Sequence, residues 1–233
     1  MSTEEPFHLV TVLRERNDRR SRKSKRARTR NALIAATAQQ MEQHGYAGLT
    51  IDGIVDEARL ARGTFYLYFS NRSEAAFAVR RKFSALMRAR RPRRTREMTR
   101  YEVLFAVNLF YIKTYRMNAR LLAGREALTH DLPKAAVLRD FLNHRWARLI
   151  LRDITRSTAM TAMVEEDRRS LLAVRTAIAM SDELLREALI YHSPTMNDLA
   201  SDDHTLAEVM SIIWYRTLYA QHPQGVPPLL GSG

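Results

Sequence analysis

The sequence predicts an all-α protein with an N-terminal helix-turn-helix three-helix domain, followed by a larger helical domain. Apolar residues recur at spacings of three and four along most of the chain, which is the period of a helix with one buried face. Helix-stopping residues separate these segments, among them Gly45, Pro92, Pro133 and Pro194. Three short helices joined by tight turns are expected over residues 29–76, a pattern typical of a helix-turn-helix.

The composition is that of an ordinary folded protein. Of its 233 residues, 45% are hydrophobic, and no run approaches the roughly 18 apolar residues of a membrane helix. The first ten residues lack the apolar core of a signal peptide. The absence of cysteine excludes thiol catalysis, and the seven histidines show no zinc-ligand spacing. We therefore expect a soluble cytoplasmic protein without a metal site, a cofactor or a membrane contact.

The net positive charge lies in the amino-terminal part of the chain. The formal net charge is +13. Residues 77–100 hold ten Lys and Arg against one acidic residue, whereas residues 101–233 hold fifteen of each sign. This asymmetry favours a polyanion as the partner of the front part, although a basic segment is also compatible with a solvated surface.

The sequence predicts the three helices of the helix-turn-helix and a fourth helix that follows them. The first has one apolar face and stops at Gly45. Thr50 starts the second by capping its amides. The third is expected from Arg62 to Phe69, and Ser73 is expected to cap a fourth that reaches about Arg91. The apolar face of the first helix consists of Leu33, Ile34, Thr37, Ala38 and Met41.

The third helix has the features of a recognition helix. Phe65 and Phe69, four residues apart, predict the face that packs on the first two helices. Tyr66 suits the boundary with DNA, because its ring is apolar and its hydroxyl can reach a phosphate oxygen. Gly63 leaves room for a phosphate to approach the backbone. The plainer alternative is that Tyr66 and Tyr68 only pack in a helical core.

The segment from Ala32 to Phe77 resembles the DNA-binding module of the tetracycline-repressor (TetR) family. The resemblance implies phosphate contacts from Thr50, Tyr66, Tyr68 and Arg72, and base-edge contacts from Arg62, Thr64 and Leu67. The matching features are Ala35-Ala36, Gly45-Tyr46, Thr50, Ile54, Ala58, the run Gly63-Thr64-x-Tyr66-x-Tyr68-Phe69, and Arg72.

The turn of the helix-turn-helix departs from this family. The family usually has Gly-Val-Ser there, whereas this chain has Arg59-Leu60-Ala61. An arginine in a left-handed position costs roughly 1–2 kcal/mol relative to glycine, and Ala61 lacks a cap worth about 1 kcal/mol. Gly53 inside the second helix costs on the order of 1 kcal/mol more. We expect these departures to affect the angle of the recognition helix and not its existence, and Arg59 is a further candidate for a phosphate contact.

Two basic segments flank this domain. Residues 1–28 are predicted to be a flexible basic arm, whose arginines suit phosphates or a narrow minor groove. The segment from Arg88 to Arg100 carries seven arginines. One interpretation is a solvated linker near DNA. The alternative is a binding site for the phosphates of an anionic ligand such as an acyl-coenzyme A, although no glycine-rich phosphate-binding loop accompanies it.

Residues 77–222 are predicted to form the helical ligand-binding and dimerisation domain, and residues 223–233 a flexible tail. The last two helices each carry two apolar stripes, so they need partners on two sides. The resemblance implies that one partner is a second subunit, and also a ligand pocket among the middle helices. Each candidate for the pocket is also compatible with an ordinary core position, and the candidates are Asn108, Tyr111, Tyr115, Phe141 and Arg175.

The function predicted is that of a ligand-responsive repressor. It acts as a homodimer on a near-palindromic operator and is released by a small apolar or amphipathic effector; the choice of repressor over activator follows from the resemblance alone. An enzyme is not expected, because no Ser/His/Asp signature, phosphate loop or metal cluster is present. The alternative is a basic helical protein that binds RNA or anionic surfaces without sequence specificity, which leaves the residues from Thr50 to Arg72 unexplained.

Overall fold

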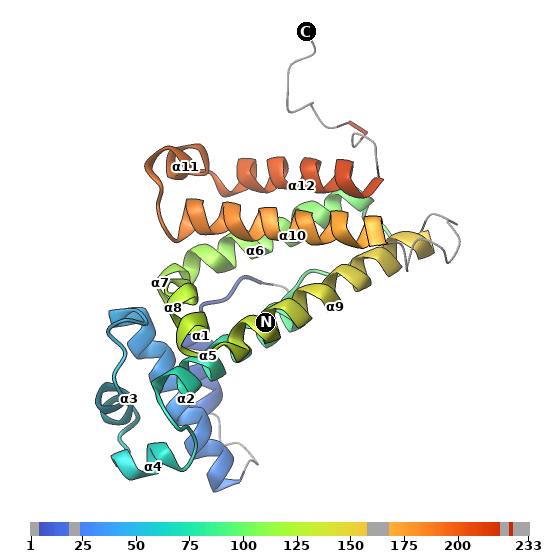
Figure 1. The fold of residues 1–233 in the computed structure, drawn as a ribbon. Coiled ribbons are helices and arrows are strands. Elements are labelled where there is room, and N and C mark those ends of the chain that lie inside the picture. Colours follow the sequence, from blue (N-terminus) through green and yellow to red (C-terminus); the bar gives the residue numbers. More distant parts are fainter. Residues whose placement is uncertain (1–4, 19–23, 158–167, 220–223, 226–233) are drawn as a thin grey trace. The chain divides into compact units, whose positions relative to one another are not determined.

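The computed structural model describes residues 5–18, 24–157, 168–219 and 224–225, and these are helical without strands (Figure 1). The chain divides into two compact units. Unit 1 comprises Met1–Arg91 and Thr114–Ala136, and unit 2 comprises Pro92–Lys113 and Val137–Gly233. None of the described helices is long and apolar enough to cross a membrane.

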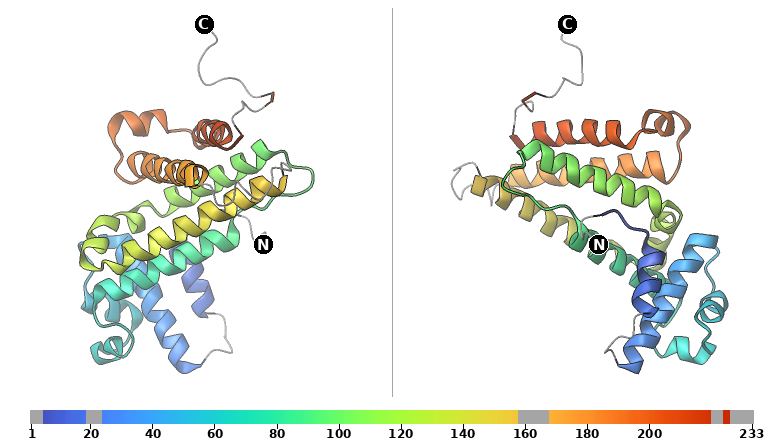
Figure 2. Two further views of the ribbon diagram at one scale, coloured as in Figure 1. Left: turned by 45° about the vertical axis from the view of Figure 1, so that its right-hand side comes forward. Right: turned by 180° about the vertical axis from the view of Figure 1, so that it is seen from behind.

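Unit 1 is built around α2 (Lys25–His44), which α1, α3, α5 and α7 contact (Figures 1 and 2). Its predicted apolar face is confirmed, since Leu33 and Ile34 are fully buried and Met41 is 2% exposed. Gly45 ends α2 with a φ of 68°, as predicted. The other helices that lie wholly in unit 1 are α1 (Leu9–Asp18), α3 (Ile51–Ala58), α4 (Arg62–Tyr66), α5 (Arg72–Arg90), α7 (Ala119–Leu122) and α8 (Arg125–Asp131).

The unit boundaries differ from the predicted division at residue 76. Helix α5 belongs with the helix-turn-helix, because it packs on α2 and α8. The first boundary follows α5, and the other two fall inside α6 (Arg100–Met117) and α9 (Lys134–Ser157). The predicted division follows the end of the helix-turn-helix pattern. The structure instead places α5, α7 and α8 in the same compact unit as the helix-turn-helix, because they pack together.

The prediction of a flexible arm over residues 1–28 is wrong for most of its described part. Residues 9–18 form α1, and α2 begins already at Lys25 after the cap residue Ser24. Helix α1 and the preceding Phe7 bury an apolar cluster, whereas the positive charge of this segment alone predicts a flexible arm. The buried residues are Phe7, Leu9, Val10, Val12 and Leu13.

Asn118 holds the start of α1 in place. This side chain is 1% exposed and lies between α6 and α7. Its Oδ1 accepts a hydrogen bond from the Leu9 amide at 2.8 Å, and its Nδ2 donates to the Phe7 carbonyl at 2.8 Å. The ring of Phe7 lies 5.7 Å from that of Phe83 on α5. One buried side-chain amide therefore satisfies the first amide of α1 and the carbonyl of Phe7, which precedes the helix.

Unit 2 contains the front part of α6, most of α9, α10 (Arg168–Leu189), α11 (Pro194–Leu199) and α12 (Asp203–Tyr219). The indole Nε1 of Trp214 donates to Ser181 Oγ at 2.7 Å, which joins α12 to α10. Apart from residues 224–225, the predicted tail lies outside the described residues. The buried cluster at the centre of unit 2 consists of Ala147, Leu151, Val174, Ala177, Ile178 and Trp214.

Candidate nucleic-acid interface

Helix α3 begins at the residue that the sequence predicts. Thr50 is extended, with a φ of −123°, and its Oγ1 accepts a hydrogen bond from the Gly53 amide at 3.0 Å. A methyl group at Gly53 would come within 2.6 Å of Gln40 Oε1. The glycine that weakens α3 as a helix therefore allows the side chain of Gln40 on α2 to lie against its first turn.

The turn between α3 and α4 has the strained arginine that the sequence predicts. Arg59 is left-handed, with φ 53° and ψ 49°. The Leu60 amide donates to the Val55 carbonyl at 2.9 Å, which closes the end of α3. Ala61 precedes α4 without a side-chain cap, as predicted. Arg59 is exposed, and its contact with a phosphate stays a prediction.

The recognition helix is shorter than predicted, because α4 ends at Tyr66 and not at Phe69. The amides of Tyr68 and Phe69 both donate to the Phe65 carbonyl, at 2.9 and 3.0 Å, so the chain leaves the helix in a tight turn. The inner face is confirmed. Phe65 is fully buried and Phe69 is 5% exposed, with ring centroids 5.7 Å apart.

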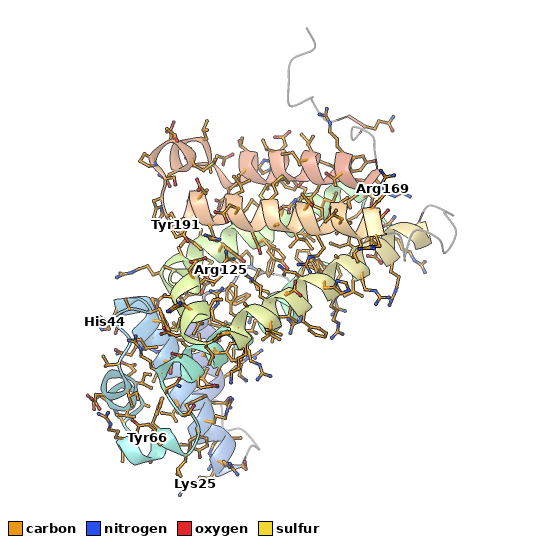
Figure 3. The ribbon with its side chains drawn as sticks, in the orientation of Figure 1. Lys25, His44, Tyr66, Arg125, Arg169 and Tyr191 are labelled. Carbon is orange, nitrogen blue, oxygen red and sulfur yellow. The ribbon has the colours of Figure 1, made fainter. Side chains whose placement is uncertain are left out.

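The outer face of α4 is open to solvent. Tyr66 is 50% exposed and Leu67 is 73% exposed, whereas Thr64 and Tyr68 are half-buried. A methyl group at Gly63 would meet nothing within 4 Å, so a ligand can approach its backbone. Core packing therefore does not account for Tyr66, which projects at the end of unit 1 that carries α4 (Figure 3).

Arg62, the first residue of α4, is held by two groups. Its Nη1 donates to Asp52 Oδ1 on α3 at 2.6 Å, while 56% of its side chain stays exposed. A hydrogen bond with the Tyr66 hydroxyl, and then that with Asp52, raise the pKa of Arg62 above its ordinary value. The sequence prediction included Arg62 and Tyr66 but did not identify their acidic neighbour as part of the site.

Arg72 has partners inside the protein that the sequence did not predict. Its Nη1 donates to the carbonyls of Ala47 and Leu49, at 3.2 and 2.8 Å. Its guanidinium also lies 5.4 Å from the ring centroid of Tyr46. Arg72 thus fixes the loop that precedes the cap residue Thr50, and its contact with a phosphate stays a prediction. The cap of α5 is Asn71, which accepts from the Glu74 amide at 2.9 Å, and not Ser73 as predicted.

Tyr46 connects the same loop to α8. Its hydroxyl donates to Asp131 Oδ2 at 2.6 Å and lies 2.9 Å from Ser73 Oγ. Burial, and then the hydrogen bond with Asp131, raise the pKa of Tyr46. Gly124 packs directly on this tyrosine, since a methyl group there would come within 2.7 Å of Tyr46 Cβ. These partners lie far along the chain, so no local sequence pattern identifies them.

The basic start of α2 lies next to the recognition helix. Lys25, Arg26 and Arg28 are exposed. The guanidinium of Arg30 lies 5.1 Å from the ring centroid of Phe69, just after α4. Figure 3 shows Lys25 at the same end of unit 1 as Tyr66. Positive charge at the start of α2 therefore lies at the end of unit 1 that carries α4.

Two of the predicted ligand residues have hydrogen-bond partners outside the predicted set. Asn108 is 8% exposed, and its Nδ2 donates to Ser211 Oγ on α12 at 2.9 Å. Arg175 instead donates to Asp140 Oδ1 on α9 at 2.7 Å. Phe141 is 57% exposed on α9, so it lies outside the core of unit 2.

The two remaining ligand candidates fall in different units. Tyr111, in unit 2, contacts Phe110 with ring centroids 5.9 Å apart, and Tyr115, in unit 1, contacts Phe83 at 6.1 Å. Within the described residues, no group of three or more His, Cys, Asp and Glu could hold a metal ion. The ligand roles of all five residues stay predictions.

The family described as "Bacterial regulatory proteins, tetR family" has a sequence model that matches residues 33–79. This range contains α3, α4, most of α2 and the start of α5. This segment of the chain is similar to the tetR family.

Two known proteins are similar to this chain, one in sequence and one in structure. An uncharacterized HTH-type transcriptional regulator in the lacX 3′ region of Lactococcus lactis subsp. lactis is 39% identical over 51 residues, which are 22% of this chain and 26% of that protein. The match thus spans about a quarter of that relative's length. The fatty acid degradation regulator FadR from Bacillus halodurans matches in structure with a TM-score of 0.55 and 19% identity, over 87% of this chain and 100% of that one. At this identity, the likeness shows the fold alone.

Proposed function

We propose that the chain is a transcriptional repressor that binds double-stranded DNA through α3 and α4. The observation that carries this proposal is the outer face of α4. Tyr66 and Leu67 project from a helix whose opposite side is fixed by the buried Phe65. The open approach to Gly63 and the basic start of α2 suit a polyanion with a groove.

The contacts on DNA divide into two kinds. Thr50, Tyr66 and Tyr68 donate hydrogen bonds to phosphates, and Arg72 fixes the loop behind Thr50 besides any phosphate contact of its own. Arg62, Thr64 and Leu67 reach base edges. Phosphate contacts position the protein on the duplex, and base contacts select the sequence.

A homodimer through the last long helices completes the proposal. On α10, Val174 and Ile178 face the core of unit 2, whereas Leu172 and Met180 are 66% and 39% exposed. Exposed apolar side chains opposite a buried stripe support a second partner for this helix. A symmetric dimer would present two copies of α4 to a near-palindromic operator.

The proposed effector is a small apolar or amphipathic molecule bound among the helices of the carboxy-terminal part. The apolar character of α6, in which Ile112 is fully buried and Phe110 is 3% exposed, supports this class of ligand. FadR regulates fatty acid degradation, so long-chain acyl compounds are the first candidates to test for release of DNA.

The proposal is tested with a selection of bound sequences from a random duplex library, followed by fluorescence anisotropy on the selected and a scrambled duplex. At about 150 mM salt, we expect the selected duplex to bind roughly 10³-fold more tightly or better. Tyr66→Ala weakens this binding. Tyr191→Ala, at a tyrosine of similar exposure (49%) in unit 2, is the matched control and leaves it unchanged. Equal affinity for both duplexes would contradict the proposal and favour non-specific binding of polyanions.

A further inference from the structure

Asp52 is an acidic residue on the surface that is proposed to meet DNA. Its side chain is 66% exposed in the first turn of α3. Phosphate groups repel a carboxylate, so an exposed aspartate here weakens binding to the duplex backbone unless its charge has another use. Its carboxylate lies 2.6 Å from the Nη1 of Arg62, on the helix that enters the groove.

The contact fixes a side chain that would otherwise be mobile. Arg62 has a long, flexible stem, and more than half of its side chain is open to solvent. Asp52 holds it from α3, and the Tyr66 hydroxyl holds it from the next turn of α4. A side chain that is already held in its bound orientation loses less conformational freedom when the complex forms.

We propose that Arg62 reads a guanine in the major groove, and that Asp52 is the positioning residue that aims it. This inference rests on the proposed DNA-binding function. The guanidinium has five N–H donors, so the bonds to Asp52 and to the Tyr66 hydroxyl leave enough of them to donate to two further acceptors. Guanine presents two acceptors, O6 and N7, side by side in the major groove, and paired donation from arginine is the commonest specific contact with a base.

A purely structural role of Asp52 makes a different prediction. An aspartate in the first turn of a helix stabilises that helix through its dipole. In that case, replacing Asp52 lowers the stability of α3 and leaves the base preference unchanged. Asp56 lies exposed on the same helix and provides a matched control, because Asp56→Asn removes the same charge away from Arg62.

The experiment uses the full-length protein and a random duplex library. The sequence motif selected by wild type is compared with those of Asp52→Asn, Asp56→Asn, Arg62→Ala and Arg62→Lys. Affinities are then measured on the selected duplex with each of the four bases at the guanine position, and on a scrambled duplex. Circular dichroism establishes that each variant is folded.

We expect wild type to prefer guanine at one position of each half-site by roughly 5- to 150-fold. Arg62→Ala abolishes this preference, and Arg62→Lys also loses it, because lysine keeps the charge without the two-pronged donor geometry. Asp52→Asn lowers it on the order of fivefold at that position alone. Both asparagine variants bind the scrambled duplex at least as tightly as wild type, since each removes one negative charge.

Three results would overturn the inference. A guanine preference that survives in Arg62→Ala refutes the reading by arginine. Equal motifs for Asp52→Asn and Asp56→Asn refute the positioning role and leave a helix-stabilising aspartate. A wild-type protein that enriches no motif refutes the proposed function together with the inference, and this result is distinct from the other two.

Discussion

Asn118→Ala tests whether the contacts of Asn118 keep the amino-terminal helix α1 docked on the rest of unit 1. The substitution removes the bonds to the Leu9 amide and the Phe7 carbonyl, both at 2.8 Å, and a third to the Thr114 carbonyl at 2.7 Å. Each buried polar group that loses its partner costs about 1–3 kcal/mol. Losing the partners of Leu9 and Phe7 therefore costs roughly 2–6 kcal/mol as long as α1 stays docked.

Helix α1 can escape this cost by detaching. Ordering its ten residues opposes docking by roughly 10–20 kcal/mol of backbone entropy. Its four buried apolar side chains, together with that of Phe7 just before it, contribute about 8–15 kcal/mol in favour. These two quantities are close, so the hydrogen bonds of Asn118 decide whether α1 docks. We expect the variant to release α1 while the rest of unit 1 stays folded.

Hydrogen exchange followed by mass spectrometry measures this directly. The amides of α1 should lose protection by roughly 30-fold or more, which corresponds to the lower limit of about 2 kcal/mol. The matched control is Asn197→Ala, at an exposed asparagine on α11, which leaves α1 protected. If Asn118→Ala keeps the wild-type protection of α1, the contacts of Asn118 do not hold this helix and the reasoning fails.

Three further predictions concern single side chains. Thr50→Ala removes the cap on the Gly53 amide and lowers the free energy of unfolding in urea by about 1 kcal/mol. Thr50→Ser retains the cap and keeps the wild-type free energy of unfolding. Equal values for the two variants would exclude a capping role. Hydrogen bonds from the Thr205 side chain and then its backbone lower the pKa of Asp202, so the stabilisation of α12 is complete above the ordinary pKa of an aspartate and is lost as the pH falls below about 4. Acid unfolding of Asp202→Asn should lack this component, and an unchanged acid transition would contradict it. Leu67, which is 73% exposed, should contact the methyl group of a thymine. Replacing that thymine by deoxyuridine then weakens DNA binding by wild type and leaves binding by Leu67→Ala unaffected. Equal losses of affinity in both proteins would refute the contact.

The sequence by itself determined the helix-turn-helix, because the features that define it are local. Gly45 and Thr50 mark where one helix ends and the next begins. The spacing of Phe65 and Phe69 gives the buried side of α4. The left-handed Arg59 followed from its place in the turn. These features depend on neighbours within a few residues, which a pattern in the sequence contains.

Tertiary structure alone decided how these elements are held. The chain does not reveal locally that Asn118 binds the start of α1, or that Asp131 binds Tyr46. It also gives no sign that Arg72 turns to backbone carbonyls. Hydrogen-bonding groups are satisfied by whichever partner the packing brings within about 3 Å, and that partner can lie a hundred residues away along the chain. Local periodicity therefore fixes which face of a helix is buried, and only the packed structure fixes what that face meets.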